Sequence, residues 1–238
     1  MSDSPFKYKP WDSEFFNQNI FELDIHDAYH LTIDHVRQSK NTLIQVKVPV
    51  ENLLLLDKLQ SFNFQIVETE MYFEKQLMPI STTNLPEKVA VLDDLEAVMK
   101  LAAHAFTYSR FRPSWFKQDD SSRFYSEWAK NAILKKYDDI CFKIEEDSTS
   151  ELFGFITGKK INAIFVKIGL ICVSEIKRGK KIGADLLRMI ENWSVAEGMS
   201  KIAVATQGSN LMAVSFYLRN GYQLKGINYW MYLKNDYF

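Results

Sequence analysis

The stretch Val173-Ser174-Glu175-Ile176-Lys177-Arg178-Gly179-Lys180-Lys181-Ile182-Gly183-Ala184 joins two segments of opposite character. The residues before it, 168–173, form a short apolar run, which predicts a buried strand. The residues after it repeat apolar side chains at helical spacing, and Gly198 fits the position of a C-terminal cap. A strand, a tight basic turn and a helix direct backbone N–H groups and a helix N-terminus toward one point. The stretch therefore predicts a site for an anion such as a pyrophosphate.

The composition is that of a globular protein with a sizeable core. Of the 238 residues, 47% are hydrophobic and 25% are charged. The 29 basic and 30 acidic side chains give a formal net charge of -1, which argues against a general nucleic-acid binder. Aromatic residues make up 14% of the chain, so either core packing or a pocket that stacks on a flat ligand could explain them.

The cysteines and the N-terminal residues bear on the cellular compartment of the protein. Cys141 and Cys172 both stand in apolar, strand-like runs, so we expect buried, reduced thiols. No Cys/His spacing is typical of zinc, and we expect no metal. No apolar run reaches the length of about 18 residues that a membrane span needs, so we expect no membrane partner. Residues 1–5 lack the basic and apolar regions of a signal peptide, which predicts a cytoplasmic protein.

Hydrophobic periodicity predicts an α/β (α+β) chain in two units. We expect a small α/β N-terminal domain, residues 1–80, and a second domain, residues 81–238, with a proline-containing linker at 78–87. In the first domain, four consecutive leucines in 51–60 predict a buried helix between strands at 42–48 and 64–77. In the second, strands are predicted at 88–92, 140–145, 152–157, 163–173, 201–206 and 222–232, and helices at 94–105, 123–136, 182–197 and 211–219.

The segment NLMAVSFYLRNGY, residues 210–222, is a second motif. Asn210 is a favourable N-cap, and Asn220-Gly221 predicts a left-handed end to the helix. Tyr217 lies two turns inside that helix. A phenol with a reference pKa of about 10 can protonate a thiolate, so Tyr217 is a candidate general acid. A tyrosine that only packs in the core would give the same pattern.

Together the two motifs resemble those of the GNAT superfamily of N-acetyltransferases. Residues 178–183 are similar to the family's coenzyme A turn, Arg/Gln-x-x-Gly-x-Gly/Ala, with Lys181 at the position of its middle glycine. Residues 210–222 are similar to its N-x-x-A-x-x-x-Y-x-x-x-G-F/Y segment. The order of predicted elements in 88–233 is also that of the family. The resemblance implies the GNAT fold, a mixed, mostly antiparallel central sheet flanked by helices.

The resemblance implies acetyl-CoA as co-substrate and assigns residues to it. Tyr217 would protonate the departing thiolate, and Asn210 would contact coenzyme A. A backbone N–H of the strand would meet the thioester oxygen, where GNAT enzymes have a β-bulge. The residues expected around coenzyme A are Leu170, Ile171, Cys172, Val173, Arg178, Gly179, Lys180, Lys181, Ile182, Gly183, Ala184 and Asn210.

Residues 104–111, 123–132, 204–207 and 229–232 resemble the nucleotide-sugar branch of the superfamily, as does the segment 11–16. This implies that the acetyl acceptor is the amine of a nucleotide-linked amino sugar of the dTDP-4-amino-4,6-dideoxyhexose type, used for surface polysaccharide or glycan synthesis. An arginine suits a diphosphate, and aromatic side chains suit a base or a 6-deoxy methyl. The candidate acceptor contacts are Tyr108, Ser109, Arg110, Phe111, Trp115, Phe116 and Trp230.

Several alternatives remain open at this point. The acceptor could be another amino-sugar nucleotide, an amino acid or a protein N-terminus, and a peptide acceptor would not need a diphosphate clamp. A GNAT domain that binds coenzyme A without catalysis is a further alternative, which Lys181 favours and which Asn210 and Tyr217 disfavour. The general base is unassigned, with Glu175 the nearest carboxylate in sequence. Exposed edge strands would allow a homodimer.

Overall fold

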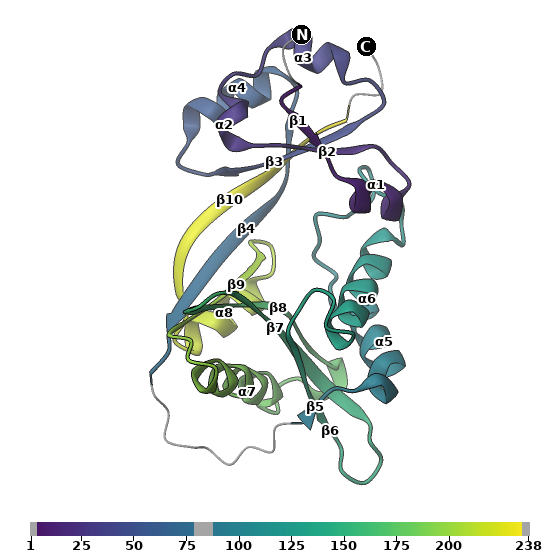
Figure 1. Cartoon of the computed structure of the whole chain (residues 1–238), viewed down its shortest axis with the longest axis vertical. Helices are drawn as coiled ribbons and strands as arrows, with labels where there is room; N and C mark the ends of the chain where they lie inside the picture. Colours follow the sequence, from purple (N-terminus) through teal and green to yellow (C-terminus); the bar gives the residue numbers. More distant parts are fainter. Residues whose placement is uncertain (1–3, 79–87, 235–238) are drawn as a thin grey trace.

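A computed structural model describes residues 4–78 and 88–234. Its described strands form one ten-stranded sheet, in the order β1-β2-β3-β10-β4-β9-β8-β7-β6-β5. Figure 1 shows two lobes along the long axis of the molecule: β1–β3 with α1–α4 at one end, and β5–β9 with α5–α8 at the other. The long strands β4 and β10 run from one lobe to the other.

The described strands are β1 Phe6–Tyr8, β2 Ile20–Leu23, β3 Leu43–Pro49, β4 Gln65–Gln76, β5 Lys88–Val89, β6 Ile140–Glu145, β7 Leu152–Asn162, β8 Phe165–Val173, β9 Lys201–Gln207 and β10 Gln223–Lys234. The described helices are α1 Pro10–Phe16, α2 Ile25–Ala28, α3 Ile33–Gln38, α4 Leu53–Ser61, α5 Leu95–Ala105, α6 Asp120–Ile133, α7 Ile182–Ala196 and α8 Leu211–Arg219, with 3-10 turns η1 Leu92–Asp94 and η2 Glu175–Lys177.

The helix predicted at residues 51–60 forms as α4, but only one of its faces is buried. Leu55, Leu56 and Leu59 lie in the core of the first lobe, whereas Leu53 and Leu54 are 65% and 84% exposed. A helix turns every 3.6 residues, so four consecutive side chains cannot share one face. The prediction of a buried helix therefore holds for one face and is wrong for the face that bears Leu53 and Leu54.

The sheet is continuous across the predicted domain boundary. Strand β10 pairs antiparallel with both β3 and β4, and β4 in turn pairs antiparallel with β9. A bidentate ion pair also joins Lys75 on β4 to Glu191 on α7, with Nζ–Oε distances of 2.9 and 2.8 Å. The boundary at 80/81 and most of the predicted linker lie outside the described residues. The division into domains 1–80 and 81–238 stays a prediction.

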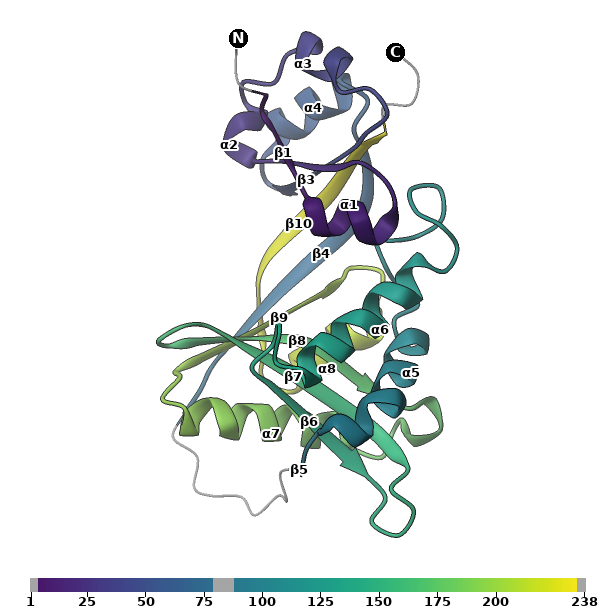
Figure 2. The ribbon, with the colours of Figure 1, turned by 45° about the vertical axis from the view of Figure 1, so that its right-hand side comes forward.

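The second lobe has the layered architecture that the sequence predicts. Strands β6, β7 and β8 form an antiparallel meander. In Figure 2, α5 and α6 cover one face of the sheet and α7 lies against the other. Each face has its own core cluster, one that includes Phe155, Leu170 and Val98, and one that includes Ile168 and Leu186. A mixed, mostly antiparallel sheet flanked by helices is thus confirmed.

Candidate active site

A wedge opens between β8 and β9. The two strands pair in parallel only where Phe165–Lys167 meets Lys201–Ala203. Beyond that point β8 continues along β7 and β9 continues along β4, so the two strands separate while each stays in the sheet. A cleft of about 1750 Å³ lies at this separation and extends to both lobes. This volume is ample for two substrates of nucleotide size.

The expected β-bulge lies in β8, beside the wedge. Ile156 of β7 is opposite Ile171, and Gly158 is opposite Ile168. Two residues of β8, Gly169 and Leu170, therefore face the single residue Thr157. The Leu170 N–H donates to Thr157 Oγ1 at 2.9 Å in place of a regular ladder bond.

Beyond Lys167, no described strand pairs with the wedge side of β8, so backbone donors of β8 face the wedge. The N–H groups of Leu170 and Ser174 point toward β7, where the Ser174 N–H donates to the Phe153 carbonyl at 2.8 Å. Because successive N–H groups of a strand point to opposite edges, those of Ile171 and Val173 point into the wedge. They can donate to an oxygen bound there, as a thioester carbonyl requires.

The basic turn after β8 has the geometry of an anion site. Gly179 and Lys181 both have positive φ angles, 77° and 65°. Lys181 thus adopts the left-handed conformation that glycine favours, at a cost of about 1 kcal/mol. It is also the N-cap of α7 and makes no side-chain cap hydrogen bond. The first N–H groups of α7 remain available to a phosphate.

The structure brings most of the predicted coenzyme A residues to one side of the cleft. Those that line it are Leu170, Ile171, Cys172, Val173, Arg178, Gly179, Lys181, Ile182, Gly183, Ala184 and Asn210. Lys180 does not line it. Asn210 caps α8 as predicted, with its Oδ1 accepting the Ala213 N–H at 3.1 Å.

Tyr217 of α8 lines the same cleft from within the core. It is 3% exposed, and its ring centroid lies 5.7 Å from that of Phe73. Burial raises its pKa well above the ordinary value of 10, so the phenol keeps its proton at neutral pH. The position suits both readings of the sequence, a core tyrosine and a general acid.

The other side of the cleft is built around Arg110. Its guanidinium lies 3.9 Å from the centroid of Trp230 and 4.3 Å from that of Phe111. It donates to Gln45 Oε1 at 2.8 Å and to the Tyr232 hydroxyl. In the described part of the chain Arg110 has no carboxylate partner, so its charge is available to an anion. Tyr108, Arg110, Phe111 and Trp230 line the cleft, and their role as acceptor contacts stays a prediction.

Three predicted acceptor contacts lie elsewhere. Trp115 and Phe116 are each 9% exposed and belong to the aromatic core cluster that joins α1 to β10. Their rings meet Tyr232 and Phe16 at centroid distances of 5.4 and 4.6 Å. Ser109 is buried and accepts the Phe111 N–H at 3.1 Å, which shapes the loop. Sequence position alone cannot tell which rings of a loop turn inward.

Sequence reasoning missed several charged residues that line the cleft, among them four on the central strands. Glu68 and Glu70 lie on β4, Lys47 on β3 and Lys167 on β8. Glu70 pairs with Lys47 at 3.1 Å, and desolvation lowers the pKa of Lys167. The alternation Glu68-Thr69-Glu70 in a predicted strand was the available signal, since it places both carboxylates on one face.

Glu68 and Glu175 differ in their surroundings. Glu68 Oε1 accepts the Thr69 N–H at 2.9 Å and lies 3.4 Å from Ser209 Oγ, with no cation paired to it among the described residues. The Glu175 side chain is 80% exposed and lies 3.4 Å from Arg178. Of the two, Glu68 is the more enclosed and the less neutralised.

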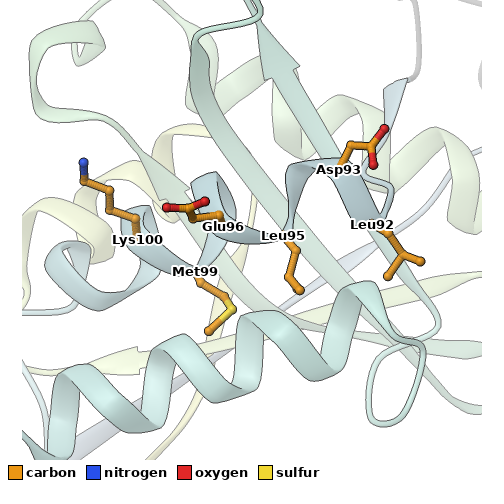
Figure 3. A pocket seen from close by; sticks show the side chains of 6 residues that line it. All are labelled: Leu92, Asp93, Leu95, Glu96, Met99 and Lys100. Carbon is orange, nitrogen blue, oxygen red and sulfur yellow. The ribbon is translucent and has the colours of Figure 1, made fainter.

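A smaller hollow, about 620 Å³, lies on α5 and is separate from the cleft (Figure 3). Its lining residues are Leu92, Asp93, Leu95, Glu96, Met99 and Lys100. The apolar side chains point to one side of α5 and the charged ones to the other, so no polar groups converge in it.

The described residues, 4–78 and 88–234, have the features of neither a metal site nor a membrane span. There, no three His, Cys, Asp or Glu side chains gather in a way that could hold a metal ion. No helix of that region combines the length and the apolar character needed to cross a bilayer. The expectation that no metal takes part stays a prediction.

Comparison with known proteins identifies relatives. Residues 96–222 match the model of the acetyltransferase (GNAT) family. The chain is 31% identical over 223 residues to the dTDP-fucosamine acetyltransferase of Escherichia coli O6:H1 (strain CFT073), an alignment that covers 93% of this chain and 95% of that protein.

Two solved structures share the fold. A GCN5-related N-acetyltransferase from Sphaerobacter thermophilus has a TM-score of 0.59 and 17% identity, over 90% of this chain and 65% of that one. The present chain thus spans about two thirds of that protein's length. A conserved protein of unknown function from Staphylococcus epidermidis has a TM-score of 0.59 and 14% identity, over 99% of this chain and 93% of that one.

Proposed function

Since the chain belongs to the acetyltransferase (GNAT) family and is an acyl-CoA-dependent N-acetyltransferase, we propose that it acetylates the amine of a nucleotide-linked amino-dideoxy sugar. The proposed acceptor is of the dTDP-4-amino-4,6-dideoxyhexose type, for surface polysaccharide or glycan synthesis. The observation that supports the proposal is a single cleft with two unlike halves. One half is the wedge between β8 and β9, which is lined by N–H groups. The other half, called the chamber here, is lined by aromatic and charged side chains that include Tyr108, Arg110, Lys167 and Trp230. The named relative supports the choice of sugar.

The wedge fits acetyl-CoA, the co-substrate that this family uses, which supplies an acetyl group already activated as a thioester. The left-handed turn at Gly179 and Lys181 and the N-terminus of α7 offer N–H groups to the pyrophosphate. The Ile171 and Val173 N–H groups offer hydrogen bonds to the carbonyl oxygen. These donors are held by the sheet, so they need little reorganisation when the substrate binds.

The chamber offers what a sugar nucleotide needs. Arg110 and Lys167 provide positive charge for a diphosphate, and Lys47 lies in the same lining. Trp230 and Tyr108 provide flat faces for a base or for the apolar face of the sugar. A protein N-terminus brings no diphosphate and would leave the charge of Arg110 without a partner.

In the proposed reaction, Glu68 and Tyr217 move the protons. Glu68 has no paired cation in the described chain and lies beside Ser209, next to the Asn210 cap, so it can take a proton from the acceptor amine, directly or through a water. Tyr217, with its raised pKa, can give a proton to the departing thiolate. The acceptor amine and the thioester would meet between them, at the separation of β8 and β9.

The test is thiol release from acetyl-CoA in the presence of a panel of dTDP- and UDP-linked amino sugars, amino acids and a short peptide. We expect turnover with a dTDP-amino-dideoxyhexose and little with the peptide. Turnover only with an amino acid or the peptide would overturn the sugar assignment and leave the acetyltransferase. Binding of acetyl-CoA without any turnover would favour a domain that only binds coenzyme A. A homodimer and a cytoplasmic location are further predictions.

A further inference from the structure

We propose that Thr157 and Asp138 are positioning residues that set the bulge of β8 and thereby aim its free N–H groups at the acyl group. The inference rests on the acyl transfer proposed above and adds two residues outside the cleft lining to its machinery. Neither residue is part of the motifs that mark the family in this sequence.

The Thr157 side chain accepts a hydrogen bond that a backbone carbonyl would accept in a regular ladder. Its side chain is 0% exposed, and its Oγ1 accepts the Leu170 N–H at 2.9 Å. At a bulge, one residue of the longer strand loses its ladder bond, and a buried N–H without an acceptor costs about 1–3 kcal/mol. The hydroxyl of Thr157 removes this cost and fixes the register at which β8 leaves the bulge.

Asp138 borders the same bulge as Thr157. It is 2% exposed, and its Oδ2 accepts the indole N–H of Trp128 at 2.9 Å. Burial raises the pKa of Asp138, while the nearby Thr157 hydroxyl and the Trp128 indole act in the opposite direction. The other carboxylate oxygen, Oδ1, is buried and accepts no hydrogen bond from the described residues. In the proposed arrangement the Thr157 hydroxyl donates to this carboxylate and presents its lone pair to Leu170, so the carboxylate orients the acceptor that the bulge needs.

Gly169 shows how tightly these groups fill the bulge. A Cβ at this position would lie 2.7 Å from Thr157 Oγ1 and 2.8 Å from Asp138 Oδ2. Real Cβ atoms do not approach polar oxygens this closely, so a side chain here would displace the pair. The bulge, the hydroxyl and the carboxylate therefore form one packed unit.

Trp128 connects this unit to the other half of the site. It donates to Asp138 and also lines the cleft, from helix α6. The chain of contacts thus runs from the cleft wall through Asp138 and Thr157 to the strand that bears the N–H donors. A purely structural series of contacts would not need to reach the strand that bears the N–H donors.

The test compares Thr157→Val, which keeps the shape but removes the hydroxyl, with Thr157→Ser, which keeps the hydroxyl. Ser194→Ala is the matched control, because Ser194 is also 0% exposed and donates to the Ile190 carbonyl at 2.6 Å, away from the cleft. We expect Thr157→Val to lower kcat about ten-fold or more, with an unchanged Kd for coenzyme A. Thr157→Ser and Ser194→Ala should stay within about two-fold of the parent kcat.

Amide hydrogen exchange gives a readout that does not depend on turnover. In Thr157→Val the Leu170 amide should exchange at least about ten-fold faster, while the Ser174 amide, bonded to the Phe153 carbonyl, should keep its rate. Asp138→Asn, which keeps the size of the side chain, should show the same change to a smaller extent. It serves as the second variant if Thr157→Val does not fold.

The outcomes separate this inference from the proposed function. An unchanged Leu170 exchange rate in both variants would overturn it, as would an equal loss of kcat in Ser194→Ala. A parallel loss of coenzyme A binding and kcat would also overturn it, since that indicates a general collapse of the cleft. If no acceptor is turned over by the parent protein, the proposed function fails, and faster Leu170 exchange still supports the positioning of the bulge.

Discussion

The guanidinium of Arg110 lies 3.9 Å from the ring centroid of Trp230, two residues separated by 120 positions in the chain. The stack is possible because β10 returns to pair between β3 and β4. Gln45 holds the guanidinium from one edge at 2.8 Å. The cation is thus fixed in a plane, and its remaining N–H groups are available to a ligand in the cleft.

Replacing Arg110 with Ala should raise the KM for the sugar nucleotide by about ten-fold or more and the KM for acetyl-CoA by less than about two-fold. The reason is that Arg110 belongs to the chamber and not to the wedge. Steady-state kinetics with each substrate varied would measure this. Arg112→Ala, an exposed arginine outside the cleft lining, is the control. Equal changes in both KM values would contradict the placement.

Glu68→Gln should lower kcat by about 10²-fold with little change in either KM, because the amide keeps the size of the side chain but cannot take a proton. Glu74→Gln is the control, since Glu74 lies on the same strand, outside the cleft lining, and pairs with Lys201 at 3.2 Å. Single-turnover measurements would separate chemistry from product release. A normal kcat in Glu68→Gln would leave deprotonation to another group.

Tyr217→Phe should lower kcat by about 10²-fold while the fold and coenzyme A binding persist. Because burial raises the pKa of Tyr217 well above its ordinary value, its proton stays in place as pH rises. The parent kcat should therefore not decline between about pH 7 and 9.5 on account of this group. Tyr222→Phe is the control, a buried tyrosine beside Glu191 outside the cleft lining. A descending limb near pH 8 in the parent kcat would indicate another acid.

Lys181→Gly should raise the free energy of unfolding by about 0.5–1 kcal/mol, because glycine adopts the φ of 65° without the steric cost that lysine bears. Lys181→Ala keeps that cost and removes the charge, so it should raise the Kd for acetyl-CoA without stabilising the protein. Thermal unfolding and calorimetry would measure the two effects. Lys180→Gly, at a position without a positive φ, should give no gain in stability; a similar gain there would contradict the argument.

Lys75→Met should destabilise the protein by about 3 kcal/mol, because it leaves Glu191 buried and without its cation. The Glu191 side chain is only 7% exposed, and its oxygens lie 2.8 and 2.9 Å from Lys75 Nζ. Lys201→Met, which breaks a more exposed pair with Glu74, should cost less than about 1 kcal/mol. Chemical denaturation of each variant would decide; equal costs would show that burial of Glu191 does not govern the effect.

Local sequence predicted the elements of the second lobe well. The apolar run of β8, the periodic helix α7 and the Asn210 cap depend on near neighbours, and the structure has all three. The local signal was weaker for α4, because four identical leucines do not indicate which side chains face the core and which face solvent. At position 181 the sequence differs from the family motif, which has a glycine there. The backbone of Lys181 nevertheless has the left-handed conformation that glycine favours.

The candidate site divides in the same way. By itself the sequence determined the strand, turn and helix of the wedge, because those residues are contiguous and the backbone of one short segment makes the anion site. Only the tertiary structure decided the chamber, because its residues come from β3, β4, β8, β10 and the loop before α6. It also decided that Trp115 and Phe116 pack inward, and that Thr157 lies opposite the bulge. Strand order and register bring these residues together, and no local pattern contains them.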